Sequence, residues 1–260
     1  MDWLRLLEGF ASALVIATVT TPVGVSGAVF LLPVQLDLLH VPNPAVTPTN
    51  LMYNVVAGPG ALLRFRRAGQ LASPLSRQLL VGTLPGVVLG AIIRVYIVPG
   101  PRVFRVVAAA VLLPIGVWLI HMALARVQRP DPPPMSSPRI TAMALVVGII
   151  GGIYGIGGGS ILGPILVGSG MAVSVVAPAA LAATFVTSMV GALTYAMLAL
   201  TSTSGSIAPE WSVGLACGLG GLIGGYMGAR LQPRMPETAL RVLLGVLAVA
   251  VAVGYLAAGV

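Results

Sequence analysis

Two stretches of the chain place glycines and small hydroxyl residues where they could bind a small anion. The clearer one, GGIYGIGGGSILGPIL at residues 151–166, has seven glycines and a proline in sixteen positions, which is incompatible with one continuous helix. A short helix that begins at such a break points its N–H groups at whatever lies there, and this end carries about half a positive charge. Glycine also lets a ligand touch the backbone, so the pattern favours an anion site.

The candidate substrate-binding residues come from this stretch, from its counterpart GVSGA at residues 24–28, and from the polar starts of two later apolar segments. They are Gly24, Ser26, Gly27, Thr49, Asn50, Gly157, Gly158, Gly159, Ser160, Thr184 and Ser188. Asn50 carries the greatest single weight, because an amide in an apolar helix needs a partner. The alternatives are structural: glycines for close helix packing, hydroxyls bonded to the carbonyl four residues earlier, and Asn50 as a link between helices.

Catalytic chemistry is poorly supported, and the sequence predicts neither a metal site nor a cofactor. One enzymatic alternative is a rhomboid-like intramembrane protease, because residues 24–27 read Gly-Val-Ser-Gly and His121 could supply a base. That motif is short in a glycine-rich chain, and the matching GIGG of the second half has no serine. The chain is therefore expected not to be an enzyme.

The composition indicates an integral membrane protein. Hydrophobic residues make up 57% of the 260 residues and charged residues only 8%, and the mean hydropathy is +1.02, whereas about a quarter of the residues of a soluble domain are charged. The net charge of +8 comes from arginines that lie between apolar segments, as the positive-inside rule requires. Nucleic-acid binding is disfavoured, because no basic face with interleaved aromatic residues is present.

The apolar segments fall into two sets of four. Each has at least the length of about 20 residues that a spanning helix needs, and the first and fifth are too long for one crossing. The eight segments cover residues 9–39, 45–63, 79–98, 103–122, 140–169, 173–200, 211–229 and 238–259. Between the sets lies the proline-rich stretch RPDPPPMSSPR, so we expect a first membrane repeat at 1–125, a cytoplasmic linker at 126–139 and a second repeat at 140–260.

The two sets match one another in sequence, which indicates an internal duplication. GVSGAVFLLPV at 24–34 aligns with GIGGGSILGPI at 155–165, and LPGVVLGA at 84–91 aligns with LIGGYMGA at 222–229. Glycines at intervals of four in the latter pair, such as Gly86 with Gly90 and the series Gly220, Gly224 and Gly228, are typical of close helix packing rather than of a ligand site.

Counting arginines tests how the segments cross. If all eight segments cross, eight arginines face one side and six the other; if segments one and five dip in and return, the split is ten against four. Making only segment five re-entrant gives eleven against three, so charge alone leaves segment one open. Because the halves repeat, we expect an all-α integral membrane protein with an inverted structural repeat, each half having four segments of which the first is broken or re-entrant.

The paired GxGGG…P stretches, the threonine-rich start of the next segment and RFRRAGQL at 64–71 resemble the TauE/SafE sulfite exporter family over essentially the whole chain. The resemblance implies a multi-pass permease of the bacterial inner membrane that carries sulfite, thiosulfate or organosulfonates such as sulfoacetate. The first half departs from the pattern, since GVSGA replaces the glycine triplet. An inverted-repeat carrier of another small metabolite or lipid is the alternative, and the expected partners are a small anion, the lipid bilayer and, as an open option, a second copy in a homodimer.

Overall fold

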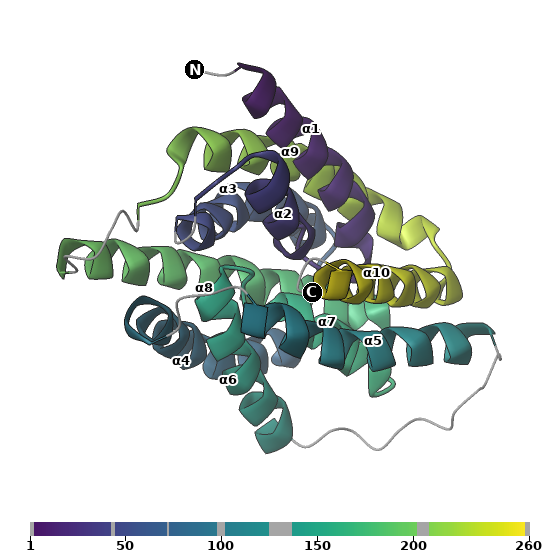
Figure 1. The fold of residues 1–260 in the computed structure, drawn as a ribbon. Coiled ribbons are helices and arrows are strands. Elements are labelled where there is room, and N and C mark those ends of the chain that lie inside the picture. The colour runs from purple at the N-terminus through teal and green to yellow at the C-terminus, as the bar shows by residue number, and fades with distance from the viewer. Residues whose placement is uncertain are drawn as a thin grey trace.

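The protein is a helical bundle, described by a computed structural model over residues 3–42, 45–71, 73–97, 102–124, 137–201 and 208–257. Ten α-helices and no strands occur in these ranges (Figure 1). The helices are α1 (Trp3–Thr20), α2 (Ala28–Pro33), α3 (Val46–Arg67), α4 (Pro74–Tyr96), α5 (Arg102–Leu124), α6 (Ser137–Tyr154), α7 (Gly159–Gly168), α8 (Val173–Thr201), α9 (Trp211–Leu231) and α10 (Glu237–Ala257). The all-α prediction is confirmed.

Six helices of the described chain are long and apolar enough to cross a membrane by length and composition. These spans are Trp3–Val23, Pro74–Tyr96, Ser137–Tyr154, Val173–Leu200, Trp211–Arg234 and Glu237–Ala257. Three shorter apolar helices accompany them, among them Gly159–Gly168. The chain is therefore a multi-pass membrane protein. Of the predicted linker, residues 126–136 lie outside the described residues, and α6 begins within its last part, at Ser137.

Both of the overlong segments are interrupted where their glycines lie. In the first, α1 is followed by a short 3₁₀ turn at Thr21–Val23, and α2 begins only at Ala28. In the second, α6 ends at Tyr154 and α7 begins at Gly159. We call residues 21–27 the first break and residues 155–158 the second break. Gly24, Gly155 and Gly157 have φ values of 77°, 70° and 70°, a left-handed conformation that costs glycine little and other residues more. The glycines therefore end the helices, as the sequence predicted.

The glycine series bring helices into close contact, which confirms their predicted packing role. Along α9, a Cβ added at each glycine of the series would overlap a backbone carbonyl oxygen of α1. Along α4, the glycines of the corresponding series meet carbonyl oxygens of α6 in the same way. The pairs are Gly220 with Phe10, Gly224 with Leu14, Gly228 with Thr18, Gly82 with Thr141, Gly86 with Leu145 and Gly90 with Ile149. Glycines that align between the two halves in sequence, such as Gly86 and Gly224, thus meet carbonyl groups that also align, those of Leu145 and Leu14.

These pairings also give the directions of the helices. Residue numbers rise together along α1 and α9, and along α4 and α6, so each pair is parallel. Helix α3 is also parallel to α9, since Val56 lies against Gly218 and Ala61 against Gly225. Because α1 and α3 run in the same direction, the chain between them, with its break and α2, must turn back before α3 begins.

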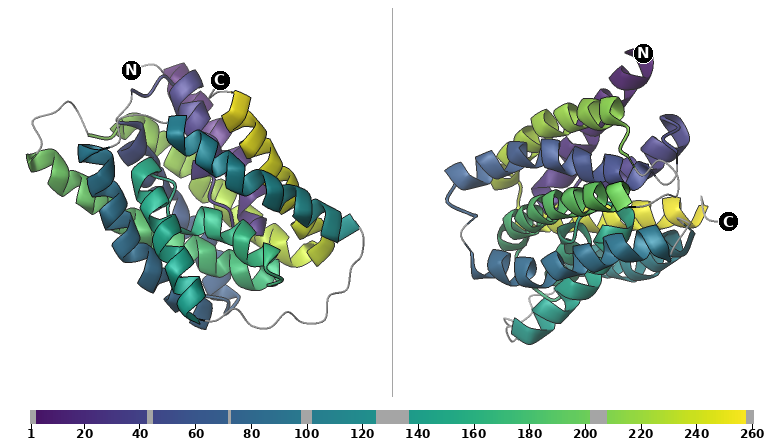
Figure 2. Two further views of the ribbon diagram at one scale, coloured as in Figure 1. Left: turned by 60° about the horizontal axis from the view of Figure 1, so that its bottom comes forward. Right: turned by 90° about the vertical axis from the view of Figure 1, so that its left-hand side faces the viewer.

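The first long helices of the second half, α6 and α8, run in the opposite direction to α3. Helix α8 runs opposite to α3, with Phe185 against Gly58 and Leu51 against Gly191. Helix α4 follows α3 after a short turn, and α6 is parallel to α4, so α6 also runs opposite to α3. The N-terminal ends of α1 and α6 accordingly project from opposite sides of the bundle in the views of Figures 1 and 2.

Eight of the twelve arginines in the described residues lie at one end of the bundle. This end holds the C-terminal ends of α3 and α9 and the N-terminal ends of α4, α6 and α10. It carries Arg64, Arg66, Arg67, Arg77, Arg139, Arg230, Arg234 and Arg241. Arg5 at the start of α1 and Arg94 at the end of α4 lie toward the opposite end. Arg102 and Arg105 at the start of α5 also lie there, because α5 runs opposite to α10. We refer to the end with the eight arginines as the arginine-rich end.

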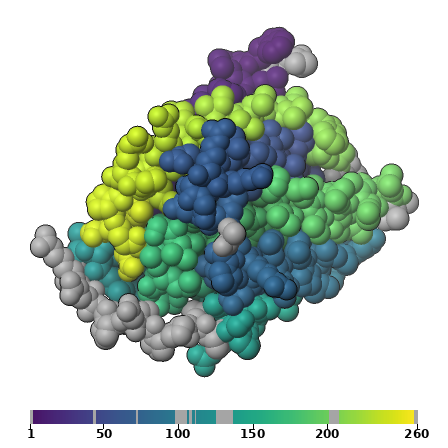
Figure 3. All heavy atoms as spheres, turned by 180° about the vertical axis from the view of Figure 1, so that it is seen from behind, coloured from purple at the N-terminus to yellow at the C-terminus, as the bar shows by residue number. Residues whose placement is uncertain are grey.

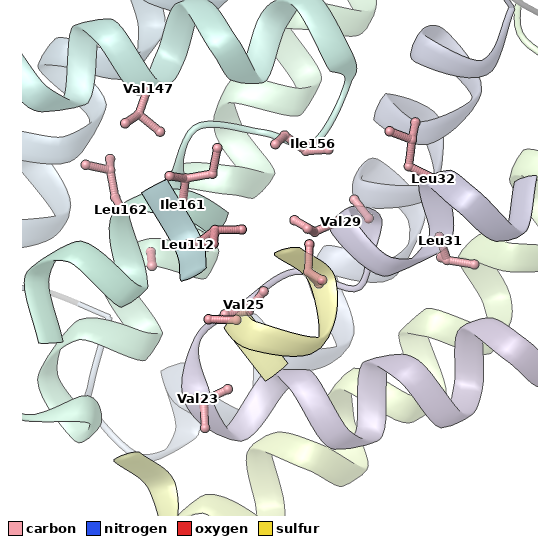
Figure 4. Close-up of a cluster of buried hydrophobic side chains, with 14 of the residues drawn as sticks. Val23, Val25, Val29, Leu31, Leu32, Leu112, Val147, Ile156, Ile161 and Leu162 are labelled. Atoms are coloured by element: carbon pink, nitrogen blue, oxygen red, sulfur yellow. The ribbon is translucent and has the colours of Figure 1, made fainter. Parts of the chain in front are cut away.

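An apolar cluster holds the two breaks together at the centre of the bundle. Val25 and Val29 of the first break and α2 are buried with Ile156 and Ile161 of the second break and α7, and Leu112 of α5 joins them (Figure 4). Burying side chains of this size stabilises a fold by about 1.5–3 kcal/mol each in water, and in lipid the tight packing itself takes over this role. In this conformation the two breaks are therefore held against one another by packing.

Candidate anion site between the two helix breaks

A cavity of about 30 Å³ lies beside the first break. Its walls come from α1, the first break, α3, α8 and α9. The lining residues are Ala17, Thr21, Ser26, Gly27, Tyr53, Asn54, Ala57, Gly58, Ala61, Leu181, Thr184, Phe185, Gly221 and Gly225. The polar lining is neutral: hydroxyls and one amide, without a charged side chain among these residues. Since one water needs about 10–15 Å³ by such a measure, the cavity in this conformation holds roughly two waters and no larger solute.

A hydrogen-bonded chain of polar groups ties this cavity to both breaks. The Ser26 hydroxyl donates to Asn54 Oδ1 at 2.5 Å and accepts from the Ala28 N–H at 3.2 Å. Asn54 Nδ2 in turn donates to the carbonyl oxygen of Gly155 at 3.4 Å. One amide on α3 therefore spans from the first break to the second, and both of its polar atoms have partners.

Helix α8 presents two hydroxyls to the second break, and neither has a partner. Thr184 and Ser188 lie one turn apart, and a Cβ added at Gly157 would lie 2.6 Å from Thr184 Cγ2 and 3.2 Å from Ser188 Oγ. Both hydroxyl oxygens are buried and unpartnered. Leaving such a group unpaired costs about 1–3 kcal/mol. Buried polar groups without partners are rare in native proteins and need an explanation.

Thr187, which lies between Thr184 and Ser188 in the sequence, bonds its hydroxyl within its own helix. Thr187 Oγ1 donates to the carbonyl oxygen of Ala183, four residues earlier, at 2.6 Å, which is the common behaviour of threonine in helices. The same oxygen accepts from the Gly158 N–H at 3.3 Å. Thr187 is thus committed to holding the break, whereas the other two hydroxyls are free to donate to a ligand.

The N-terminus of α7 lies against the hydroxyl of Thr184. Gly159, the first residue of this ten-residue helix, packs so closely on α8 that an added Cβ would overlap the carbonyl oxygen of Ala180 and lie 2.6 Å from Thr184 Oγ1. The partial positive charge of a helix N-terminus is concentrated in its first turn. Thr184 consequently joins three features: the cavity, the second break and the positive end of a helix.

Of the eleven sequence-predicted residues, six are brought together here. Ser26, Gly27 and Thr184 line the cavity, and Gly157, Gly159 and Ser188 surround Thr184 on the side of the second break. Asn50 lies one turn before Asn54 on α3. Its Nδ2 donates to the carbonyl oxygen of Ala28 at 3.0 Å, while its Oδ1 is buried without a partner, so it links helices as the alternative reading expected and retains one free acceptor.

The remaining four residues are engaged elsewhere. Thr49 donates to the carbonyl oxygen of Ala45 at 2.7 Å and accepts from the Glu210 N–H at 2.9 Å, and Ser160 donates to the carbonyl oxygen of Ile156 at 3.0 Å. Gly24 packs against Ala177, and an added Cβ at Gly158 would lie 2.5 Å from Thr83 Cγ2. Gly24, Gly158 and Ser160 thus shape the breaks by packing and local hydrogen bonds, whereas Thr49 joins the start of α3 to the residue before α9.

Three kinds of site residue lie outside the predicted set. Asn54 opens the same apolar segment as Asn50, and the sequence gives it less weight than Asn50 although it too is an amide in an apolar helix. Thr187 has the same type and setting as Thr184. Tyr53 and the glycines Gly221 and Gly225 line the cavity only because α3 packs on α9, and no local signal in the sequence indicates that pairing.

A family model described as "Sulfite exporter TauE/SafE" matches residues 9–255 of the chain. The matched range includes both breaks, the hydroxyls of α8 and the glycine series of α4 and α9. No curated protein and no solved structure matches the chain.

Proposed function

Because the chain belongs to the sulfite exporter TauE/SafE family, we propose that it is a permease that exports small sulfur-containing anions across the bacterial inner membrane. The candidate substrates are sulfite, thiosulfate and organosulfonates such as sulfoacetate. The observation that carries the choice of site is the pair of buried, unpartnered hydroxyls of Thr184 and Ser188 beside the N-terminus of α7. Their donors, the helix end and the neutral cavity wall suit an oxyanion that sheds part of its hydration.

We propose further that the two halves form an inverted repeat. Three features support this: the matched glycine series meet matched carbonyls, α1 and α6 enter the bundle from opposite ends, and in each half the chain turns back after the break. In membrane terms, the arginine-rich end is the cytoplasmic end. Inverted repeats place substrate sites where broken helices meet near the middle of the membrane, which is where Thr184 lies in this arrangement.

The sidedness has a direct test at positions outside the described residues. Single cysteines are introduced at Met135 and Ser204 in a Cys217→Ser background and labelled with an impermeant thiol reagent. Position 135 should be reached from the cytoplasm and position 204 from the periplasm. Labelling of both from the same side would contradict the inverted arrangement.

Transport requires a second conformation. The cavity of about 30 Å³ is too small for a sulfur oxyanion, and its lining comes from the half of α8 and α9 that lies toward the arginine-rich end. Toward the opposite end of the bundle, two hydrogen bonds close the structure. The Glu210 N–H bond to Thr49 joins the start of α9 to α3, and the Asn50 bond to Ala28 joins α3 to α2. We infer a nearly closed state from which two helix groups, α1 with α3 and α9, and α4 with α6 and α8, rock against one another to admit the anion, as in other inverted-repeat transporters.

Export needs no coupling ion in this proposal. An inside-negative membrane potential drives anions outward by about 2.3 kcal/mol per charge per 100 mV, and proton-coupled transporters usually keep a carboxylate in the membrane interior. In this chain Glu8 and Asp37 lie at half-exposed or exposed positions near helix ends, and Glu210 and Glu237 precede or begin helices. The described spans therefore offer no buried carboxylate for a proton.

Reconstituted vesicles test the function and its driving force together. Proteoliposomes loaded with thiosulfate or sulfite receive a potassium diffusion potential of either sign, with the same pH on both sides. Efflux should accelerate when the lumen is negative and slow when the sign is reversed. Efflux that follows a pH gradient and ignores the potential would contradict the uncoupled mechanism, and no efflux of any sulfur anion would contradict the function.

The second candidate function is carriage of a larger apolar molecule, and one feature favours it. A groove of about 340 Å³ with almost entirely apolar walls lies between α3, α8 and the start of α9. It is lined by Pro48, Met52, Val55, Ala192, Tyr195, Ala196, Ala199, Ala208, Pro209 and Trp211. Thermal-shift measurements with sulfite, thiosulfate, sulfoacetate, taurine, sulfate and short-chain lipids separate the two, because a ligand that binds the native state raises its stability.

A further inference from the structure

The arginine-rich end of the bundle lies close to the candidate anion site on two of its helices. The cavity is lined by Ala61 of α3 and Gly225 of α9, which pack on one another with 3.5 Å between the Ala61 nitrogen and a Cβ added at Gly225. Arg67 follows Ala61 by six residues and Arg230 follows Gly225 by five. At 1.5 Å per residue these distances along the helix axes are about 9 Å and 8 Å.

These arginines are accessible and have no acidic neighbour to neutralise them. Arg66, Arg67, Arg230 and Arg234 are all exposed. Among the described residues of this end, the one carboxylate is that of Glu237, and it is already occupied by the Arg241 guanidinium at 3.1 Å and the Val173 N–H at 2.9 Å. The end of α3 therefore presents a net positive field. Figure 3 shows the blue chain of this region on the molecular surface, between the yellow C-terminal helices and green α8.

The site itself contrasts with this surface, because its lining carries no charge. Neutral donors bind an anion without a fixed counter-charge and so release it readily, but they attract it only at short range. A cluster of like charges at the mouth of a cleft raises the local concentration of the opposite ion and its rate of arrival. Along α3 and α9, the charged arginines can therefore attract an anion from a distance, and the neutral donors of the cavity can bind it at short range.

We propose that Arg66, Arg67, Arg230 and Arg234 form an electrostatic entrance that collects the anionic substrate at the arginine-rich end and delivers it to the neutral site beside Thr184. This inference rests on the proposed function. It also assigns a preference among substrates, because in the same potential a dianion such as thiosulfate gains twice the interaction energy that a singly charged sulfonate gains.

Position on the bundle distinguishes an entrance from a general membrane anchor. Arg77 and Arg139 lie at the same end and are exposed, but they belong to α4 and α6, which contribute no described residue to the cavity lining. The double variant Arg67→Gln/Arg230→Gln therefore has a matched control in Arg77→Gln/Arg139→Gln, with the same loss of charge from the same end. Both arginine pairs suit the positive-inside rule equally.

The experiment measures thiosulfate transport in proteoliposomes over a range of substrate and salt concentrations, with protein orientation determined by labelling. At about 50 mM salt, Arg67→Gln/Arg230→Gln should raise the apparent KM for thiosulfate about threefold to tenfold and leave the maximal rate within twofold, while the control pair changes KM less than twofold. The difference should disappear near 1 M salt, where the Debye length is about 3 Å. The effect on isethionate, a singly charged sulfonate, should be smaller.

Two results would overturn the entrance. Equal KM changes in both double variants would show that the arginines act only as anchors, and an unchanged KM in Arg67→Gln/Arg230→Gln would show that they attract nothing. In either case transport by the unsubstituted protein remains and the proposed function stands. Failure of the unsubstituted protein to move any sulfur anion would overturn both, so the two failures are distinguishable.

Discussion

The two helix breaks occupy matched positions in the two halves, and they solve the problem of buried polar groups in opposite ways. The first break carries its own hydroxyl, Ser26, which is fully bonded to Asn54 and Ala28. The second has Gly157 at the matched position, and the polar groups facing it, Thr184 and Ser188, lie on α8 without partners. The serine of the first break is therefore bonded within the protein, although Thr20 Oγ1 just before that break and Asn50 Oδ1 on α3 lack partners. At the second break neither Thr184 nor Ser188 has a partner, and we propose that a bound anion supplies it.

The two breaks also differ two residues later, where the following helices α2 and α7 begin. Ala28 at the start of α2 is fully buried with its Cβ in place, while its counterpart Gly159 has no room for a Cβ against Ala180. The second break thus places bare backbone and a helix end against α8 at the position where the first half has a methyl group. These differences are the reason for placing the proposed anion contacts at the second break, on the side of the cavity formed by Thr184.

The largest expected effect is at this pair of positions. Gly159→Ala forces α7 away from α8, because the new methyl group would overlap the carbonyl oxygen of Ala180, and overpacking of this kind costs about 1–3 kcal/mol or more. Ala28→Gly should cost about 1 kcal/mol. Thermal melting of the detergent-purified variants measures both, and equal losses would remove the asymmetry between the breaks.

The glycine series should respond alike in the two halves, with losses of about 1–3 kcal/mol. Gly86→Ala and Gly224→Ala each place a methyl group against a carbonyl oxygen of the neighbouring helix, Leu145 in one half and Leu14 in the other. Similar decreases in melting temperature would support the repeat. A large loss at one position and none at the other would show that the halves are packed independently.

Ser26→Ala should destabilise the protein by about 1–2 kcal/mol. It removes the hydroxyl that donates to Asn54 Oδ1, and a buried acceptor left without its donor costs about 1–3 kcal/mol. Thermal melting measures the loss. Unchanged stability would mean that the first break, like the second, tolerates unpaired polar groups.

Thr184→Val should have the smallest effect on stability and a large effect on transport. The hydroxyl has no partner, so replacing it with a methyl group of similar size leaves the melting temperature unchanged or slightly raised. Transport should fall at least tenfold, since the donor to the anion is gone. Thr187→Val is the matched control: it removes the acceptor of the Gly158 N–H and should lower stability. Retained transport in Thr184→Val would contradict the site.

Much of the fold follows from local properties of the sequence. The breaks at residues 21–27 and 155–158 were predictable from their glycines, because Gly24, Gly155 and Gly157 adopt the left-handed conformation that ends a helix. The prolines of the two stretches, Pro33 and Pro164, lie inside α2 and α7 and do not mark the breaks. The glycine series of α4 and α9 also indicated close packing. The partners of these helices were not predictable, because pairing α1 with α9 and α4 with α6 crosses the boundary between the halves, and a single sequence carries no signal for contacts at such separations.

The site shows the same division. Sequence by itself determined the membrane class, the helical fold, the two breaks and a pool of neutral hydroxyl and amide residues near them, because hydropathy and backbone preference act over a few residues. Only the tertiary structure decided which members of that pool are free. Thr184 and Thr187 are identical residues three positions apart on one helix. One is consumed by Ala183 and Gly158 while the other faces Gly157 unpaired, because a hydrogen bond depends on the atoms that packing brings within about 3 Å.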